Sequence, residues 1–210
     1  MVPQLYYITG RRQFPGGAKE QERRLLEKIG ECAAAGVQYI QLREKDLGTR
    51  ALEELARKAA GTVRGSGTKL LINSKTDVAL ASGAHGVHQP GNDLPASEAR
   101  AIFARAGYPH PIIGVSAHSL ADVLNAEAHG ADFAAFAPVF EKAGTVNSVG
   151  LELLRQICHR AHAAMPVFAL GGVTLENARL CLEAGAAGIA GIRIFQENDV
   201  GRIVTALRSV

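Results

Sequence analysis

The sequence predicts an α/β fold in which eight strands alternate with helices and close into a (β/α)8 TIM barrel. Short apolar runs recur along the 210 residues, segments of helical periodicity separate them, and no linker-like stretch interrupts the alternation. The phosphate-binding pattern GxGxxG is absent after the first run, which argues against a doubly wound open sheet. Eight such units in this length favour one barrel domain, residues 1–210.

The expected strands are nearly continuous apolar runs, as is typical of parallel strands covered by helices. Helical periodicity fills the segments between them, for example "KEQERRLLEKIGECAAAG", "TRALEELARKAAGTV" and "LADVLNAEAHG". Gly36, Gly130 and Gly185 follow three of these helices and are expected in left-handed conformation just past the helix end. In chain order, the expected strands are residues 4–9, 37–42, 69–73, 84–88, 111–116, 132–137, 166–170 and 187–192.

The composition excludes several classes of function. The formal net charge is only +3, and lysine and arginine are spread along the chain, which favours small anions over nucleic acid as ligands. No apolar stretch approaches ~20 residues, so no membrane span is expected, and "MVPQLYYITGRR" lacks a signal-peptide pattern. The three cysteines, Cys32, Cys158 and Cys181, are far apart and are expected to be reduced core thiols. We therefore expect a cytoplasmic protein.

Polar residues follow several of the expected strands, at the end of the barrel where such folds build their sites. Along "YIQLREKD", Gln41, Arg43 and Lys45 alternate and are expected to point towards the barrel mouth, with Glu44 pointing outward. A buried amide or guanidinium needs partners, so this convergence predicts a ligand site. The other strand ends bring Thr9 and Arg11, Asn73, His88, Ser116 and His118 to the mouth, with Asp93 in a loop.

Two parts of the mouth suit anions. "LGGVT" contributes Gly171 and Gly172, and a helix expected to begin near Thr174 would present its N-terminus there, as in the phosphate sites of many barrels. Arg43 and Lys45 form a second cationic locus, suited to a diphosphate. The pair of sites suggests two phosphorylated substrates being joined, or one doubly anionic ligand.

The order of the motifs resembles the thiamine phosphate synthase family, together with its close relative, the thiazole tautomerase. The resemblance covers nearly the whole chain. It rests on "LYYIT", "QLREKD", "LLIN", "GVHQPGNDLP", "GVSAHS", "GADFAAFAPVF", "GLELL", "PVFALGGVTLENA" and "EAGAAGIAGI" in this order.

The resemblance implies a synthase that joins hydroxymethylpyrimidine diphosphate to hydroxyethylthiazole phosphate and releases pyrophosphate by dissociative substitution. By motif, Gln41 and Asn73 would hold the pyrimidine, and Arg43, Lys45 and Ser116 would contact the diphosphate. Asp93 would bind Mg2+. Gly172 and the backbone near Ile192 would bind the thiazole phosphate, with Gly171 beside them.

Departures from the family pattern bear on the metal and on the second substrate. Ser74 stands where the synthases usually have a second acid, so a weakened Mg2+ site is expected. The loop after strand six reads "EKAGTVNS", in which Lys142 or Thr145 would replace the usual Thr-Lys pair. Gly10 and Arg193 also depart from the usual residues.

Two other functions remain open at this point. A tautomerase would move a proton on a thiazole carboxylate phosphate without metal, using His118 as the acid–base group. A non-catalytic relative would bind thiamine precursors without turnover. The resemblance further implies a possible homo-oligomer.

Overall fold

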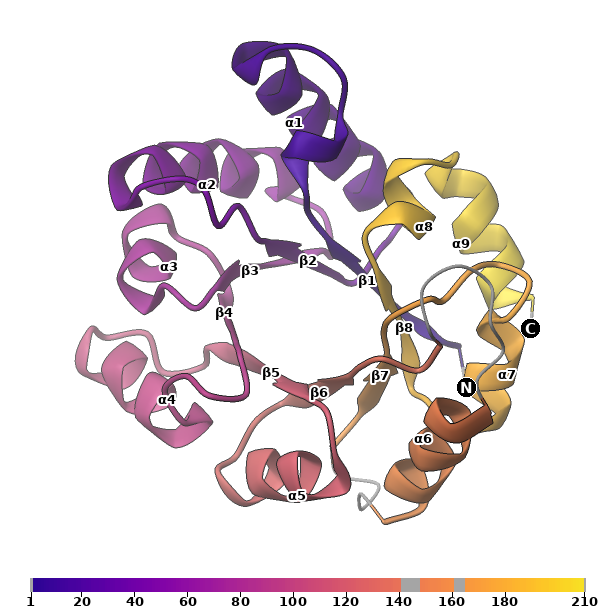
Figure 1. The fold of residues 1–210 in the computed structure, drawn as a ribbon. Coiled ribbons are helices and arrows are strands. Elements are labelled where there is room, and N and C mark those ends of the chain that lie inside the picture. The colour runs from indigo at the N-terminus through magenta and orange to yellow at the C-terminus, as the bar shows by residue number, and fades with distance from the viewer. Residues whose placement is uncertain (1, 141–147, 161–164, 210) are drawn as a thin grey trace.

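A computed structural model describes residues 2–140, 148–160 and 165–209. Its eight strands form a closed parallel barrel in sequence order, and β1 pairs with β8 to complete the ring (Figure 1). The predicted barrel is therefore confirmed, and each predicted strand lies within two residues of an observed one. The strands are β1 Gln4–Ile8, β2 Tyr39–Leu42, β3 Lys69–Asn73, β4 Gly86–Gln89, β5 Ile112–Ala117, β6 Phe133–Phe136, β7 Val167–Ala169 and β8 Gly188–Gly191.

The helices surround the barrel and cover the outer face of its strands (Figure 1). Left-handed glycines follow three of them as predicted, with φ of 79° at Gly36, 72° at Gly130 and 100° at Gly185. The helical segments are η1 Arg11–Gln13, α1 Ala18–Ala34, α2 Thr49–Val63, α3 Thr76–Ser82, α4 Ala96–Arg105, α5 Leu120–Ala128, α6 Ser148–Arg160, α7 Ala178–Glu183, α8 Arg193–Gln196 and α9 Val200–Arg208.

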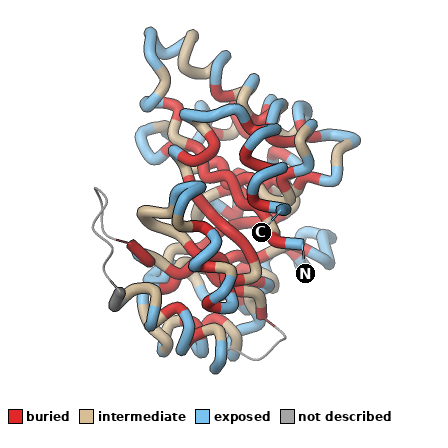
Figure 2. The backbone as a smooth tube through the Cα atoms, turned by 90° about the vertical axis from the view of Figure 1, so that its right-hand side faces the viewer, coloured by how far each residue is buried: buried red, intermediate tan, exposed pale blue. Residues whose placement is uncertain are grey.

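The core has two layers because successive strand side chains face opposite sides of the barrel wall. In β1, Tyr6 and Ile8 face the barrel interior with Phe133 and Phe168, whereas Tyr7 packs outward under the helices. The aromatic rings fill the interior, so the barrel centre is packed and not hollow. Figure 2 shows the buried residues running through the middle of the molecule with the exposed residues outside.

The remaining sequence expectations about the fold concern cysteines and membrane segments. Cys32 and Cys181 are buried and Cys158 is half-buried, and all three thiols are free. Burial raises the pKa of Cys32 to about 12 and that of Cys158 to about 11, so these thiols stay protonated near neutral pH. None of the helices in the described residues is both long and apolar enough to cross a membrane.

Candidate active site

Two amide side chains meet at the carboxyl ends of neighbouring strands. Gln41 on β2 is buried, and its Nε2 donates a hydrogen bond of 2.9 Å to Oδ1 of Asn73 on β3. The parallel register of β2 and β3 brings the two residues together. The contact uses one donor of Gln41 and one acceptor site of Asn73. The carbonyl oxygen of Gln41 and the amide N–H groups of Asn73 therefore remain available to a ligand.

The chain bends sharply directly after Asn73. The backbone N–H of Lys75 donates to the carbonyl of Asn73 at 2.7 Å, and the residue between them, Ser74, has φ of 66°. This is a γ-turn with positive φ, a strained conformation for a residue with a side chain. The N–H of Ser74 also donates to the carbonyl of His88 at 2.9 Å, which ties the turn to β4.

The Ser74 hydroxyl donates a hydrogen bond to Oδ2 of Asp93 in the loop after β4. The other carboxylate oxygen of Asp93 accepts from the N–H of Leu94 at 2.8 Å. Within residues 2–140, 148–160 and 165–209, no group of three or more His, Cys, Asp or Glu side chains gathers around a metal position. One carboxylate with a neighbouring hydroxyl fits Mg2+ only where substrate phosphate and water supply the other oxygens, which is how Mg2+ is often bound.

The predicted cations after β2 lie in different environments. Lys45 is exposed in the turn and Arg43 is half-buried. The charge of Arg43 contributes, after burial, to lowering the pKa of His88.

Arg11 was expected to offer a further cation, but the structure ties it to two carboxylates. Its guanidinium donates to Asp46 at 2.6 and 2.8 Å and to Glu44 at 3.2 Å. Glu44, expected to point outward, is buried, and it accepts the hydroxyl of Thr9 at 2.6 Å and the backbone N–H of Arg11 at 3.1 Å. Thr9 Oγ1 in turn accepts the backbone N–H of Arg43 at 2.9 Å. This network fixes the loop that carries Arg43 and Lys45.

A buried histidine connects β4 to two other strands. His88 lies with Nδ1 3.0 Å from the hydroxyl of Tyr6 and Nε2 2.9 Å from the hydroxyl of Ser116. Burial, and then the nearby charge of Arg43, lower the pKa of His88 to about 3, so the ring is neutral near pH 7. Ser116 is half-buried at the end of β5, where it was predicted to reach the mouth.

His118 lies two residues further along and is exposed. Its Nδ1 is 2.7 Å from the carbonyl of Ala137, which can only accept, so the neutral form of the ring carries its proton on Nδ1 and its lone pair on Nε2. The backbone N–H of His118 donates to Asp122 at 2.8 Å, and this bond lowers the pKa of the Asp122 carboxyl. The position of His118 is thus fixed at both its backbone and its ring.

The glycines after β7 adopt conformations with positive φ, 90° at Gly171 and 66° at Gly172. The carbonyl of Gly171 accepts from the N–H of Phe140 at 3.0 Å, and that of Gly172 accepts from Asn177 at 3.0 Å. The helix begins at Ala178 and not near Thr174 as expected. Thr174 lies in a turn before the helix, and its backbone N–H donates to the side-chain oxygen Oδ1 of Asn177 at 2.8 Å.

After β8, Ile192 is the residue that precedes α8. The carbonyl of Ile192 accepts from the N–H groups of Phe195 and Gln196. The N–H groups in the first turn of a helix have no acceptor within that helix, so those at the start of α8 can bind a ligand. The Gly171–Gly172 turn and the start of α8 occupy the positions at which barrels commonly bind phosphate. Lys142 and Thr145 lie outside the described residues.

Sequence patterns brought Thr9 and His88 to the mouth and pointed Glu44 outward, but they gave no partners for these residues and no role to Tyr6. The signal that could have found the Tyr6–His88 contact is the alternation along β1 and β4, which turns both side chains towards the barrel interior. A polar atom there requires a partner. Thr9 and Glu44 had no such signal, because their contact depends on how two loops fold against each other.

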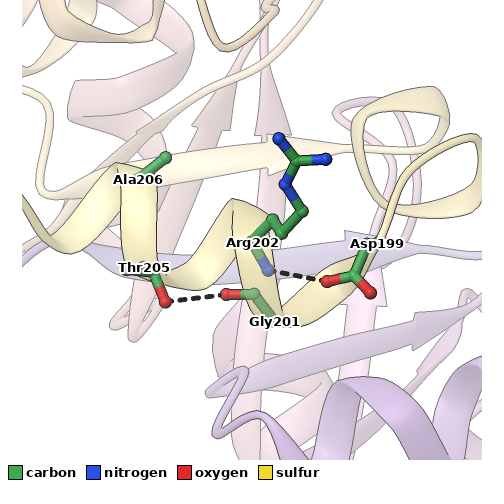
Figure 3. A pocket seen from close by; sticks show the side chains of 5 residues that line it. All are labelled: Asp199, Gly201, Arg202, Thr205 and Ala206. Carbon is green, nitrogen blue, oxygen red and sulfur yellow. Dashed lines mark hydrogen bonds between the residues drawn. The ribbon is translucent and has the colours of Figure 1, made fainter.

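The structure also has a hollow of about 480 Å³ along α9, lined by Asp199, Gly201, Arg202, Thr205 and Ala206 (Figure 3). Two of these residues serve the helix itself: Asp199 accepts from the N–H of Arg202 at 2.8 Å, and Thr205 donates to the carbonyl of Gly201 at 2.9 Å. None of the five belongs to a strand end. The hollow is therefore separate from the candidate site.

Comparison with known proteins finds relatives that match nearly the whole chain. A family model described as thiamine monophosphate synthase matches residues 5–195. A putative thiamine-phosphate synthase 2 of Aquifex aeolicus is 37% identical over 93% of this chain and 99% of its own length. The thiamine-phosphate synthase of Shouchella clausii is 37% identical over 97% and 93%. A solved thiamine phosphate pyrophosphorylase from Pyrococcus furiosus is 33% identical, with a TM-score of 0.80 over 99% of this chain and 95% of that one. The predicted family is confirmed: the chain belongs to the thiamine monophosphate synthase family.

Proposed function

We propose that this protein is a transferase, a thiamine phosphate synthase, which joins hydroxymethylpyrimidine diphosphate to hydroxyethylthiazole phosphate and releases pyrophosphate. Membership of the family supports this activity. The observation that carries it in the site is the Gln41–Asn73 amide pair, with Arg43, Ser116 and Asp93 on the neighbouring strand ends.

The amide pair suits an aminopyrimidine. The free oxygen of Gln41 can accept a hydrogen bond from the exocyclic amino group, and the free N–H groups of Asn73 can donate to a ring nitrogen. The hydrogen bond between the two side chains holds them in a fixed position relative to one another. Binding therefore requires little further ordering of these groups.

The reaction breaks the bond between the pyrimidine methylene carbon and the diphosphate oxygen, and the electron pair leaves with the oxygen. The resulting pyrimidine cation is captured by the lone pair of the thiazole nitrogen, which forms the new C–N bond. Negative charge develops on the departing diphosphate, so cations and hydrogen-bond donors directed at it lower the barrier. Arg43 supplies a planar pair of donors, Lys45 supplies a point charge and Ser116 supplies a hydroxyl.

We assign the metal role to Asp93, with Ser74 beside it. A Mg2+ ion held there with substrate oxygens would neutralise part of the diphosphate charge. The single carboxylate predicts weaker metal binding than a pair of acids would give. The Asp93–Ser74 hydrogen bond keeps the carboxylate at the mouth next to Asn73.

The thiazole phosphate is assigned to the Gly171–Gly172 turn and the first N–H groups of α8 after Ile192. Both carbonyls of the glycine pair are bound to protein groups, which fixes the orientation of the turn. Lys142 or Thr145 is assigned to contact both substrates, by the family resemblance alone.

The proposed synthase activity is tested by supplying both substrates to the purified protein and measuring pyrophosphate and thiamine phosphate, with and without a chelator. We expect Mg2+-dependent product that falls at least about 100-fold in Lys45→Ala, because a cation facing the leaving group is lost. The control is Lys58→Ala, which removes an equal charge from an exposed pair with Glu22 on the helices. If the wild-type protein forms no more product than Lys45→Ala does, the synthase proposal is rejected.

One observation favours a second candidate, the metal-independent thiazole tautomerase. The hydrogen bond between His118 Nδ1 and the Ala137 carbonyl leaves Nε2 free to take a proton. That activity predicts exchange of a ring proton of the thiazole carboxylate phosphate with solvent deuterium, lost in His118→Ala and unaffected by chelator. A binding protein without catalysis would show calorimetric binding of both precursors and neither reaction.

The proposal extends to the whole chain. We assign residues 1–210 to one barrel domain that acts on phosphorylated small molecules in the cytoplasm. A homo-oligomer is the further expectation from the family. Light scattering of the purified protein measures it directly.

A further inference from the structure

Three side chains from three different strands form a continuous hydrogen-bonded line from the barrel interior to its mouth. Tyr6 on β1 is fully buried, His88 on β4 is buried, and Ser116 on β5 is half-buried. The Tyr6 hydroxyl is 3.0 Å from His88 Nδ1, and Ser116 Oγ is 2.9 Å from His88 Nε2. A line of this kind has two possible directions, because a neutral imidazole donates at one nitrogen and accepts at the other.

The surroundings of Tyr6 decide the direction. Its ring packs against Tyr39, Phe133 and Phe168, with centroids 6.0, 5.3 and 5.8 Å away. In the described part of the chain, His88 Nδ1 is the hydrogen-bond partner found for its hydroxyl. If Nδ1 carried the proton, the Tyr6 hydroxyl proton would face aromatic rings and remain unsatisfied in the core, which is unfavourable. Tyr6 therefore donates to Nδ1, and the imidazole proton is on Nε2.

The direction at Tyr6 fixes the hydrogen bond at the other end. With its proton on Nε2, His88 donates to Ser116 Oγ, which accepts through a lone pair. The hydroxyl proton of Ser116 is then not used inside the barrel and can be donated to a ligand at the mouth. The lowered pKa of His88 is consistent with this direction, because a neutral ring carries a single proton and therefore donates at one nitrogen only.

We propose that Tyr6 and His88 are positioning residues that hold Ser116 as an obligatory hydrogen-bond donor to the departing diphosphate. The inference rests on the proposed function for the identity of the anion. The polarity of the line rests only on the contacts of these three residues. An anion has lone pairs and no proton, so a serine held in the accepting direction would not stabilise it.

The tautomer of His88 is measured by two-dimensional 15N NMR of the unliganded wild-type protein, with the His88 signals identified by their loss in His88→Gln. Other histidines supply internal references. His85 accepts the backbone N–H of Leu70 at Nδ1 and must be protonated on Nε2. The Nδ1 of His118 and that of His129 each face a carbonyl oxygen, at 2.7 and 2.8 Å. We expect His88 to match His85. A proton on Nδ1, or rapid exchange between tautomers, overturns the proposal.

Kinetics of Tyr6→Phe test the consequence. Without the Tyr6 proton, His88 is free to take the other tautomer and Ser116 can turn its proton inward. We expect kcat to fall about tenfold with KM for the diphosphate substrate nearly unchanged. The matched control is Tyr39→Phe, which removes a hydroxyl from the same aromatic cluster and should leave kcat within about twofold. Thermal unfolding of both variants checks that the core is retained.

A double-mutant cycle with Ser116→Ala separates positioning from a structural role. If Tyr6 acts through Ser116, adding Tyr6→Phe to Ser116→Ala causes no further loss of kcat. An equal tenfold loss in that background overturns the proposal. If the wild-type protein makes no thiamine phosphate, the synthase proposal fails, but the NMR measurement still decides the polarity of the line because it needs no substrate.

Discussion

The hydroxyl of Thr9 lies 2.6 Å from Oε1 of Glu44 and joins the end of β1 to the loop after β2. The same hydroxyl oxygen accepts the backbone N–H of Arg43, and the same carboxylate accepts from Arg11. The position of the proposed diphosphate cations therefore depends on a buried anion that does not itself face the substrate.

Replacing Glu44 by Gln is expected to lower the free energy of unfolding by about 1–3 kcal/mol, because Arg11 loses a buried charged partner. Urea unfolding measures this value. The control is Glu53→Gln, which breaks an exposed pair with Arg57 and should change stability by about 0.5 kcal/mol or less. Equal effects in the two variants would show that the Glu44 network does not hold the loop.

The metal assignment predicts opposite effects at two neighbouring positions. Asp93→Asn should raise the Mg2+ concentration for half-maximal activity by at least about tenfold, and Ser74→Asp should lower it by about tenfold, since ligand charge sets the affinity of such sites. Aspartate also tolerates the positive φ of 66° at this position. Titration of activity with Mg2+ gives both values.

A control and a measurement without substrate accompany this prediction. Asp77→Asn changes an exposed carboxylate in the first turn of α3 and should leave the Mg2+ titration unchanged. In Ser74→Asp the two carboxylates repel one another, so Mg2+ should raise Tm in this variant more than in the wild type. An unaltered titration in Asp93→Asn would remove Asp93 from the metal site.

Gly172→Ala is expected to raise KM for the thiazole phosphate about tenfold. The added Cβ would lie 2.7 Å from the carbonyl oxygen of Phe140, so the turn must move. Gly130→Ala is the control: it also has positive φ, 72°, but its Cβ would meet no atom within 4 Å. We expect Gly130→Ala to lose about 1 kcal/mol of stability with KM unchanged. A normal KM in Gly172→Ala would place the phosphate elsewhere.

The neutral His88 makes folding sensitive to acid. Its pKa is lowered to about 3 in the folded protein, whereas an unfolded histidine titrates near about 6.5. Between these values the unfolded state binds more protons, so stability falls as pH decreases, by up to about 1.4 kcal/mol per pH unit. Chemical denaturation from about pH 7 to about pH 5 should show a steeper loss in the wild type than in His88→Gln. Parallel curves would contradict a neutral buried ring.

The strands were predictable because each is buried on both faces and reads as an apolar run. The start of α7 was not. A local pattern placed it near Thr174, but Asn177 uses its side chain to bind Thr174 and Gly172 and holds those residues in a turn. The competition between a side chain and the helical backbone for the same N–H is invisible to periodicity.

The sequence predicted which residues lie at the strand ends but not most of the contacts between them. Alternation placed Gln41 and Arg43 on one side of β2, and the structure agrees in joining Gln41 to Asn73. The pairing of Arg11 with Glu44 and Asp46 could not be read from the sequence, because it links two loops that are distant along the chain. The roles of the predicted site residues stay predictions, and two of these residues, Lys142 and Thr145, lie outside the described residues.

The γ-turn at Ser74 separates two properties of the mouth. The turn is closed by backbone atoms of Asn73 and Lys75 and anchored by the carbonyl of His88, so the side chain at position 74 takes no part in making it. If Asp93 binds Mg2+ as proposed, metal affinity can therefore change through this one side chain while Asn73 keeps its contact with Gln41. On the proposed assignments, a substitution at position 74 would thus alter the metal requirement and leave recognition of the pyrimidine unchanged.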